Sequence, residues 1–290
     1  MTETPPPIPV VDSIKEIGSR YRAWLVDIWG VMHNGGAAFP KAGLATSAFR
    51  ASGGIVVLLS NSPRPSPKVQ EQLRALGVPD DAYDATITSG DLTRYELGKH
   101  QSARAFHLGP ERDRPVFAGL DVTLSDWTDA DLVVCTGLFD DEFETPDDYA
   151  ELLGSMAGRK LTMICANPDH MVERGNKLIY CAGALAAAYE AQGGKVIYAG
   201  KPYAPAYDLA LETIATLAGG EVPKDQVLAI GDGVNTDIAG AGNVGIDAVF
   251  VASALHAPGD GGEMLDPLHV AKLFPHTKRR PLAATHALSW

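Results

Sequence analysis

The stretch A-W-L-V-D-I-W-G-V-M-H, residues 23–33, decides the fold prediction for this chain. Its apolar part, W-L-V at 24–26, predicts a short buried strand of the kind found at the centre of parallel sheets. The strand ends on Asp27 and continues into a glycine-rich turn that begins at Gly30. Open α/β sheets hold ligands outside the carboxyl ends of their strands, so this turn is a candidate site. Asp27 alone is weak evidence, because many strands end in Asp for turn chemistry.

Composition limits the classes of protein to consider. The chain has 290 residues, enough for one large domain or two of ordinary size. Hydrophobic residues make up 46% and charged residues 21%, which is typical of a globular protein with a full core. The net charge of −12 argues against nucleic acid as a partner.

Membrane and secretion signals are not predicted. The longest apolar run, near 55–59, is the length of a strand and far shorter than a membrane span. The first residues, M-T-E-T-P-P-P-I-P, do not have the layout of a signal peptide. Three sparse cysteines without C-x-x-C spacing favour reduced thiols, so we expect a cytoplasmic protein without a membrane partner.

The chain order predicts two domains. A helix over 40–52 leads to a second buried strand at 55–59, and strand, helix and strand in succession indicate a parallel sheet. The same alternation of strands and helices is predicted after Gly193–Gly194, with strands at 196–198, 227–230 and 248–251 and a helix through Leu217. Between these parts we expect strands at 103–108, 131–136 and 161–165, and helices near 90–99, 146–157 and 181–192. The prediction is a doubly wound core over 1–83 and 191–290, with an inserted α/β domain over 84–190.

Four of the core strand ends carry polar residues. They are Asp27, Ser60-Asn61, Lys201, and Asp232 with Asp237. The carboxyl ends of parallel strands share one sheet edge, so we expect these side chains to converge. Two or three carboxylates suit Mg²⁺, Lys201 would offset their charge, and Ser60 with nearby N–H groups could hold a phosphate. A carboxylate nucleophile, a metal and a phosphate grip together favour phosphoryl transfer through an aspartyl-phosphate.

At this point the sequence resembles a known superfamily. D-I-W-G-V, L-L-S-N-S, A-G-K-P and G-D-G-V-N-T-D-I follow the order of the four motifs of the haloacid dehalogenase (HAD) superfamily. C-A-N-P-D at 165–169, followed by C-A-G-A-L-A-A-A-Y-E, resembles its class IIA branch, the NagD-like and nitrophenylphosphatase-like proteins. The resemblance implies a Rossmann-like core with an α/β cap inserted between the second and third motifs.

The resemblance also implies roles for individual residues. Asp27 would be the nucleophile, and Lys201 would steady Asp27 and the transferring group. Mg²⁺ would be held by Asp27, the backbone carbonyl of Trp29 and Asp232, with Asp237 as a further ligand or an anchor. The phosphate would be bound by Ser60, the Asn61 amide and Lys201. In the cap, Asn167 and Asp169 would face the substrate.

One position departs from the pattern of the superfamily's phosphatases. They carry Asp two residues after the nucleophile as general acid and base, and this chain has Trp29 there. An indole does not exchange a proton at neutral pH, so a contribution of about 10²–10⁴-fold is missing or comes from elsewhere. The substrate could have an acidic leaving group, such as an acyl or aryl phosphate. His33 or Asp169 could substitute, or the protein could bind a phosphorylated ligand and barely turn it over.

Simpler readings of these residues stay open. Asp237 could be a helix N-terminal charge, Lys201 a solvated turn lysine, and Asn167-Pro168-Asp169 ordinary turn chemistry. His33 is more often a loop residue than a catalyst, and Trp29 could chiefly pack over the site.

The prediction is a magnesium-dependent phosphatase that acts on a small phosphorylated metabolite. The alternative is a phosphate-ligand binding protein with vestigial catalysis. The intact G-D-x-x-x-x-D motif argues against carbon–halogen hydrolysis, because the dehalogenase branch uses no metal. A homodimer is compatible with exposed cap surfaces.

Overall fold

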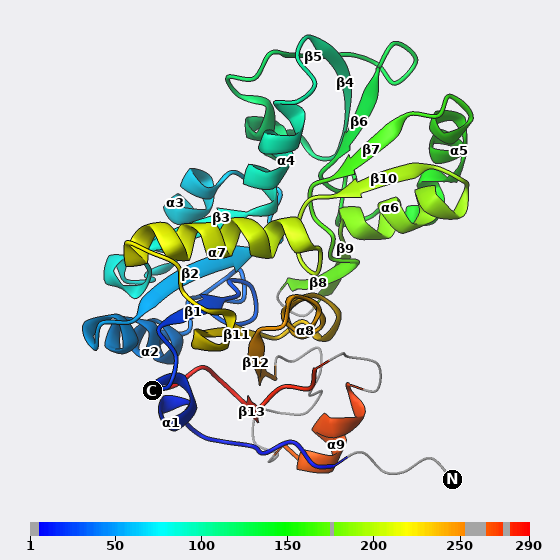
Figure 1. Cartoon of the computed structure of the whole chain (residues 1–290). Helices are drawn as coiled ribbons and strands as arrows, with labels where there is room; N and C mark the ends of the chain where they lie inside the picture. The colour runs from blue at the N-terminus through cyan, green and yellow to red at the C-terminus, as the bar shows by residue number, and fades with distance from the viewer. Residues whose placement is uncertain (1–5, 175–176, 253–264, 275–278) are drawn as a thin grey trace. The chain divides into compact units, whose positions relative to one another are not determined.

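A computed structural model describes residues 6–174, 177–252, 265–274 and 279–290, and their contacts divide the chain into two compact units (Figure 1). Unit 1 is formed by the described residues within Met1–Ser60, Glu71–Ile87 and Tyr207–Trp290. Unit 2 is formed by those within Asn61–Gln70 and Thr88–Ala206. Each unit has its own sheet and its own buried core.

Unit 1 is organised around a six-stranded sheet. In spatial order its strands are β13 (Ala283–Thr285), β12 (Asp247–Val251), β11 (Val227–Gly231), β1 (Ala23–Val26), β2 (Ile55–Ser60) and β3 (Ala85–Thr88). From β13 to β2 each neighbouring pair is parallel. The chain runs outward from β1 to β3 on one side and from β11 to β13 on the other. The topological switch point of this sheet therefore lies between β1 and β11.

Helices flank this sheet, as in a doubly wound fold. The elements of unit 1, including two helices that continue into unit 2, are α1 (Lys15–Gly18), α2 (Pro40–Ala51), α3 (Ser66–Leu76), η1 (Asp80–Ala82), α7 (Ala204–Ala218), η4 (Lys224–Gln226), η5 (Val234–Ile238), α8 (Ala239–Val244) and α9 (Pro267–Lys272). Trp24 is fully buried, and its ring stacks on Phe49 of α2 at a centroid distance of 3.9 Å. The apolar run that predicted a strand thus anchors the centre of the core.

Unit 2 contains a second parallel sheet. Its strands, in spatial order, are β10 (Lys195–Tyr198), β7 (Thr162–Cys165), β6 (Leu132–Cys135), β4 (Ala103–Leu108) and β5 (Val122–Leu124). The chain runs from β4 to β5 on one side and from β6 through β7 to β10 on the other. The switch point of this sheet therefore lies between β4 and β6.

The remaining elements of unit 2 surround that sheet. They are α4 (Ser89–Leu97), η2 (Glu111–Phe117), η3 (Pro146–Tyr149), α5 (Ala150–Gly158), α6 (Ala182–Ala191) and an antiparallel hairpin of β8 (Met171–Arg174) and β9 (Lys177–Tyr180). Leu153, Met156, Leu185 and Tyr189 are fully buried against the sheet. The predicted α/β fold class, with parallel sheets and flanking helices, is confirmed.

One strand is in a different sheet from the one expected. The sequence interpretation assigned residues 191–290 to the core, whereas β10 pairs with β7 in unit 2 through Lys195–Thr162 to Tyr198–Cys165. The physical reason is the crossover: α6 packs against both strands, and a strand–helix–strand connection places its two strands side by side. The expectation that all four polar strand ends leave one sheet is therefore wrong for Lys201, which follows β10.

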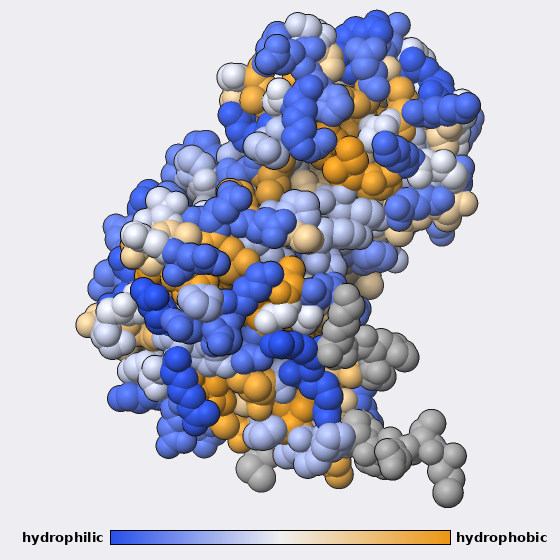
Figure 2. Space-filling view, in the orientation of Figure 1, coloured by the Kyte–Doolittle hydropathy of each residue, from blue (hydrophilic) through white to orange (hydrophobic). Residues whose placement is uncertain are grey.

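The surface of both units is mostly hydrophilic in the view of Figure 2, with hydrophobic residues scattered among polar ones. Across the described ranges, every helix is too short or too polar to cross a membrane.

Candidate active site

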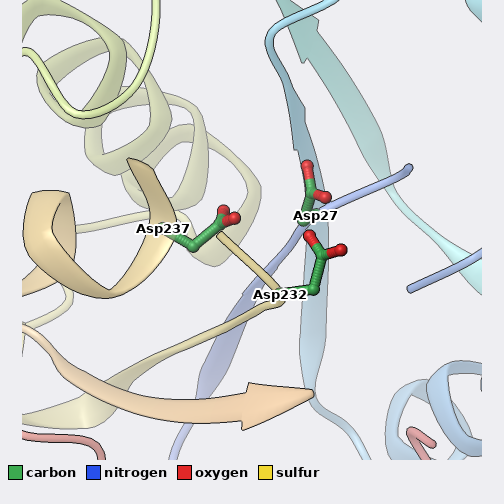
Figure 3. A group of neighbouring side chains, drawn as sticks. All are labelled: Asp27, Asp232 and Asp237. Atoms are coloured by element: carbon green, nitrogen blue, oxygen red, sulfur yellow. The ribbon is translucent and has the colours of Figure 1, made fainter. Parts of the chain in front are cut away.

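Three carboxylates meet at the switch point of unit 1. Asp27 directly follows β1, and its N–H donates to Ile230 O on β11 at 2.8 Å. Asp232 follows β11, and Asp237 lies in the short π-helix η5. One carboxylate oxygen from each lies within 4.8 Å of the other two, and Figure 3 shows the groups facing a common space. Asp27 and Asp237 are buried and Asp232 is half-buried.

The turn after β11 fixes the Asp237 side chain. The Gly233 N–H donates to Asp237 Oδ2 at 3.0 Å, and the Tyr207 hydroxyl donates to the Asp237 carbonyl at 3.1 Å. A side chain at Gly231 would place its Cβ 2.2 Å from Asp237 Cγ. The glycines of the G-D-G motif therefore give the carboxylate room and a backbone donor.

A glycine also lets the first loop approach the acidic cluster. Gly30 has φ +84°, and a Cβ there would lie 2.1 Å from Asp232 Oδ2. Glycine alone adopts this conformation freely and leaves that space empty. The glycine-rich turn that follows β1 is thus built around the Asp232 carboxylate.

The donor set fits a hard cation. Three carboxylates this close repel one another, and a divalent cation among them would offset that repulsion. Oxygen ligands from a few carboxylates are what Mg²⁺ prefers. The spacing of the Asp27, Asp232 and Asp237 carboxylates therefore fits a bound Mg²⁺ ion.

Trp29 packs within its own loop. Its ring contacts the His33 ring edge-on, with centroids 5.1 Å apart and planes at 75°. A Cβ at Gly35 would lie 2.5 Å from Trp29 Cη2, so the indole lies directly over that glycine. The indole therefore occupies space that the loop has kept clear for it.

His33 is held as a neutral imidazole. It is 2% exposed, and burial lowers its pKa to about 4. Its Nδ1 accepts a hydrogen bond from the Gly35 N–H at 2.9 Å, which assigns the remaining proton to Nε2. A ring with this pKa carries no extra proton to donate at neutral pH, so His33 is a poor replacement for the missing general acid.

The other predicted residues gather in unit 2. Asn61 donates to Asp169 Oδ1 at 2.9 Å and exchanges two hydrogen bonds with the backbone of Lys201. Asn167 Oδ1 accepts from the Asp169 N–H at 3.1 Å, which is ordinary turn chemistry. Asn61, Asn167 and Lys201 are buried, and Asp169 is half-buried.

The predicted site residues thus form two groups. Asp27, Trp29, Ser60, Asp232 and Asp237 belong to unit 1. Asn61, Asn167, Asp169 and Lys201 belong to unit 2. Sequence reasoning missed two residues that support these groups. Tyr207 holds the Asp237 turn, and the Ser89 hydroxyl donates to Asn61 Oδ1 at 3.4 Å. Neither lies in a motif, so the sequence offered no signal for them.

A doubly wound α/β sheet with three carboxylates at its switch point defines an α/β protein with a candidate metal site. Comparison with known proteins identifies its family. Residues 24–123 match the family model of haloacid dehalogenase-like hydrolases, and residues 198–275 match a second, HAD-hydrolase-like model. A hydrolase of the haloacid dehalogenase-like family from Brucella suis 1330 is 44% identical, with a TM-score of 0.85 over 96% of this chain and 99% of that chain. The chain belongs to the haloacid dehalogenase-like hydrolase family.

Two further relatives agree with this assignment. An acid sugar phosphatase from Staphylococcus haemolyticus is 24% identical over 81% of this chain and 86% of its own length. A p-nitrophenyl phosphatase from Archaeoglobus fulgidus shares the fold, with a TM-score of 0.67 and 17% identity over 92% of this chain and 96% of that chain. The predicted membership of the haloacid dehalogenase superfamily is confirmed.

Proposed function

We propose that this hydrolase is a magnesium-dependent phosphatase of a small phosphorylated metabolite, with Asp27 as its nucleophile. The observation that carries the proposal is the cluster of three carboxylates at the switch point of unit 1. The acid sugar phosphatase among the relatives supports the substrate class. Asp27, the Trp29 carbonyl and Asp232 would hold Mg²⁺, with Asp237 as ligand or anchor. The ion would neutralise charge on the phosphoryl oxygens.

The reaction would proceed in two displacements. A carboxylate oxygen of Asp27 forms a bond to phosphorus while the bond to the leaving oxygen breaks, which gives an acyl phosphate. Water then attacks that phosphorus, the bond between phosphorus and the Asp27 oxygen breaks, and the Asp27 carboxylate is regenerated. The oxygen and both protons of the water leave with the inorganic phosphate. Ser60, the Asn61 amide and Lys201 would bind the phosphoryl group. Asn167 and Asp169 would contact the rest of the substrate, and unit 2 would act as the cap domain.

Trp29 narrows the proposed substrates. Protonation of the leaving oxygen would need a replacement for the family's Asp, and His33 is buried and neutral. Asp169 already accepts a hydrogen bond from Asn61. The substrates that suit this chain best therefore have leaving groups acidic enough to depart unprotonated, as acyl and aryl phosphates do.

A leaving-group series tests this proposal. With Mg²⁺ present, phosphate release is measured on aryl phosphates of graded phenol pKa, acetyl phosphate and an alkyl sugar phosphate. We expect kcat/KM of the native protein to fall steeply as the leaving-group pKa rises. Trp29→Asp should flatten that dependence and raise the rate on the alkyl phosphate by about 10²-fold. Trp29→Phe, which keeps an aromatic ring over Gly35, is the matched control and should leave the slope unchanged.

The same series separates the alternatives. Asp27→Asn should release no phosphate from any substrate. If the native protein and Trp29→Asp are both silent while phosphate still binds, the chain is a phosphate-ligand binding protein with vestigial catalysis. Release of halide from a haloacid without metal would instead point to carbon–halogen hydrolysis.

A reducing compartment fits the cysteines. Cys135, Cys165 and Cys181 are buried free thiols, and burial raises the pKa of each well above its ordinary value. Thiols of this kind are inert core residues. They support the cytoplasmic location that is part of this proposal.

A further inference from the structure

The carboxamide of Asn61 is the centre of a buried hydrogen-bond cluster in unit 2. Its side chain is 4% exposed. Nδ2 donates to Asp169 Oδ1 at 2.9 Å and to Lys201 O at 3.1 Å. Oδ1 accepts from the Lys201 N–H at 2.8 Å and from the Ser89 hydroxyl at 3.4 Å. A carboxamide has two donor hydrogens and two acceptor lone pairs, so its whole capacity is used.

Two of these bonds grip one residue from both sides. Asn61 binds the N–H and the C=O of Lys201, as the backbone of a neighbouring strand would. The contact also fixes the amide orientation, because the Lys201 N–H needs an oxygen and its carbonyl needs a donor. Aspartate has the same shape but lacks the donors, and alanine lacks both functions. The side chain at position 61 therefore has to be a carboxamide to make this contact.

The contact between Asn61 and Lys201 is closely packed. A Cβ at Gly200 would lie 2.2 Å from Ser89 Oγ and 2.6 Å from Asn61 Oδ1. The Asp169 loop is fixed as well, because the Gly183 N–H donates to the Asp169 carbonyl at 3.1 Å. Asn61 thus bridges the Asp169 loop and the Lys201 segment by direct hydrogen bonds to both.

We propose that Asn61 is a positioning residue whose carboxamide sets the spacing between Lys201 and Asp169. This inference rests on the proposed function, in which Lys201 binds the phosphoryl group and Asp169 contacts the rest of the substrate. The Asn61 side chain would then position both residues. The Asn61 carboxamide itself then does not bind the phosphate. Its contribution there comes from its backbone N–H, and its loss weakens phosphate binding through Lys201.

The first arm of the test needs no enzymatic activity. Amide hydrogen exchange at Lys201 is compared in the native protein, Asn61→Ala and Asn61→Asp. We expect Asn61→Ala to speed exchange of that amide about tenfold, the equivalent of one lost hydrogen bond. Asn61→Asp should protect it, since a carboxylate oxygen still accepts. Asn243→Ala, at an exposed asparagine of α8, is the matched control and should change nothing.

The second arm measures the affinity for inorganic phosphate, and kcat and KM, as functions of pH. In Asn61→Asp both donors are lost and a negative charge faces Asp169, so phosphate should bind about tenfold more weakly at pH 8. The ratio of variant to native affinity should rise as the pH falls, because the protonated carboxyl regains one donor. A purely structural role would lower thermal stability and reduce affinity by the same factor at every pH.

The outcomes separate the two proposals. Unchanged Lys201 exchange in Asn61→Ala, or a pH-independent loss in Asn61→Asp, overturns the role of Asn61. A native protein that binds phosphate but releases none from any substrate overturns the proposed function instead. In that case the exchange and binding arms still decide the role of Asn61.

Discussion

The two units contain the same kind of sheet and use its switch point in opposite ways. In unit 1 the strand ends at β1 and β11 present the carboxylates of Asp27 and Asp232 to a common space, together with Asp237. In unit 2 the space beside the ends of β4 and β6 is filled by side chains that belong to, or directly follow, those strands. Both sheets are parallel and doubly wound, so the difference lies in the residues that come after each strand.

The switch point of unit 2 is a closed polar cluster. His107 Nε2 lies 2.9 Å from Thr136 Oγ1, and Thr136 also bonds Asp113. Burial lowers the pKa of His107 to about 4, so the ring is neutral at pH 7. Asp113 is 3% exposed, with Arg64 at 3.9 Å. A Cβ at Gly109 would lie 2.0 Å from Thr136 Oγ1, so backbone and side chain meet where a ligand would otherwise enter.

The comparison separates what a fold contributes to a site from what side chains contribute. A switch point places strand ends where a ligand could bind. In unit 1, glycines keep that place clear for charged groups, with Gly30 against Asp232 and Gly231 against Asp237. In unit 2 the charged group, Asp113, is satisfied by its neighbours.

The largest effect should follow from removing a carboxylate at the switch point of unit 1. Asp232→Asn removes one charged donor from the cluster, so Mg²⁺ affinity should fall by about 10²-fold and phosphate release with it. Titration calorimetry with Mg²⁺ measures the first and phosphate release the second. Asp225→Asn, at an exposed acid of the same unit, is the control. Asp113→Asn should leave Mg²⁺ affinity unchanged, and equal losses in the two variants would break the comparison.

The next effect should come from overfilling the closed switch point. Gly109→Ala forces Thr136 or the backbone to move, which should lower the free energy of unfolding by about 2 kcal/mol. Urea unfolding measures it. Because Gly109 has φ +152°, any side chain there also strains the backbone. Gly119→Ala, at a glycine of unit 2 with φ +72° near which a Cβ would have no neighbour within 4 Å, is the matched control and should destabilise less. A Gly109→Ala protein as stable as the control would show that unit 2 has room for a ligand there.

A smaller effect should depend on pH. Burial raises the pKa of Asp113 from 3.8 to about 6, so the folded state binds this proton more tightly than the unfolded state. That stabilisation is complete below about pH 4 and is lost as the pH rises through 6. Relative to Asp113→Asn, the native protein should lose about 1.5 kcal/mol of unfolding free energy between pH 5 and pH 8.

Urea unfolding at both pH values measures this change. Asp129→Asn, at an exposed acid of unit 2, should show no such pH dependence in its difference from the native protein. A constant difference for Asp113→Asn would mean that the carboxyl is not desolvated and that the cluster is open to water.

The sequence predicted the open switch point far better than the closed one. Asp27 and Asp232 could be found because each follows an apolar run whose burial is unambiguous. The cluster of Asp113, His107 and Thr136 could not, because these residues lie in no motif and meet only when β4 and β6 pair. The partner of β10 was missed for a related reason. Four residues, K-V-I-Y, predict a strand but not the sheet that it joins.

Local sequence also gave too little information to predict short or polar elements. The β8–β9 hairpin has no clear alternation of apolar and polar residues, and β13 consists of small residues, so neither was predicted. For Asn61 the motif indicated a phosphate site and was silent about the carboxamide, whose four partners come from Ser89, Asp169 and Lys201. Long-range pairing of this kind leaves no mark on local sequence.

The smallest effect is expected at the β8–β9 hairpin, where an ion pair between Arg174 and Asp141, here called the tether, joins the hairpin to unit 2. Arg174 donates to Asp141 through both terminal nitrogens, at 3.1 and 2.8 Å, and Asp141 also pairs with Arg112. These arginines are partly exposed, so Arg174→Gln should cost less than about 1 kcal/mol of unfolding free energy. Amide exchange within β8 and β9 should nevertheless become a few-fold faster, since the tether acts on the hairpin alone.

Hydrogen exchange resolved by segment tests this, with β6 as the internal reference. Lys177→Gln removes a charge at the position paired with Arg174 without touching Asp141, so it should leave exchange in the hairpin unchanged. If both variants speed exchange equally, the charge of the hairpin matters and the tether does not. If Arg174→Gln also speeds exchange in β6, the hairpin is part of the same cooperative unit as the closed switch point. The contrast between a rigid centre and a tethered edge in unit 2 would then be wrong, because local opening would spread through the whole sheet.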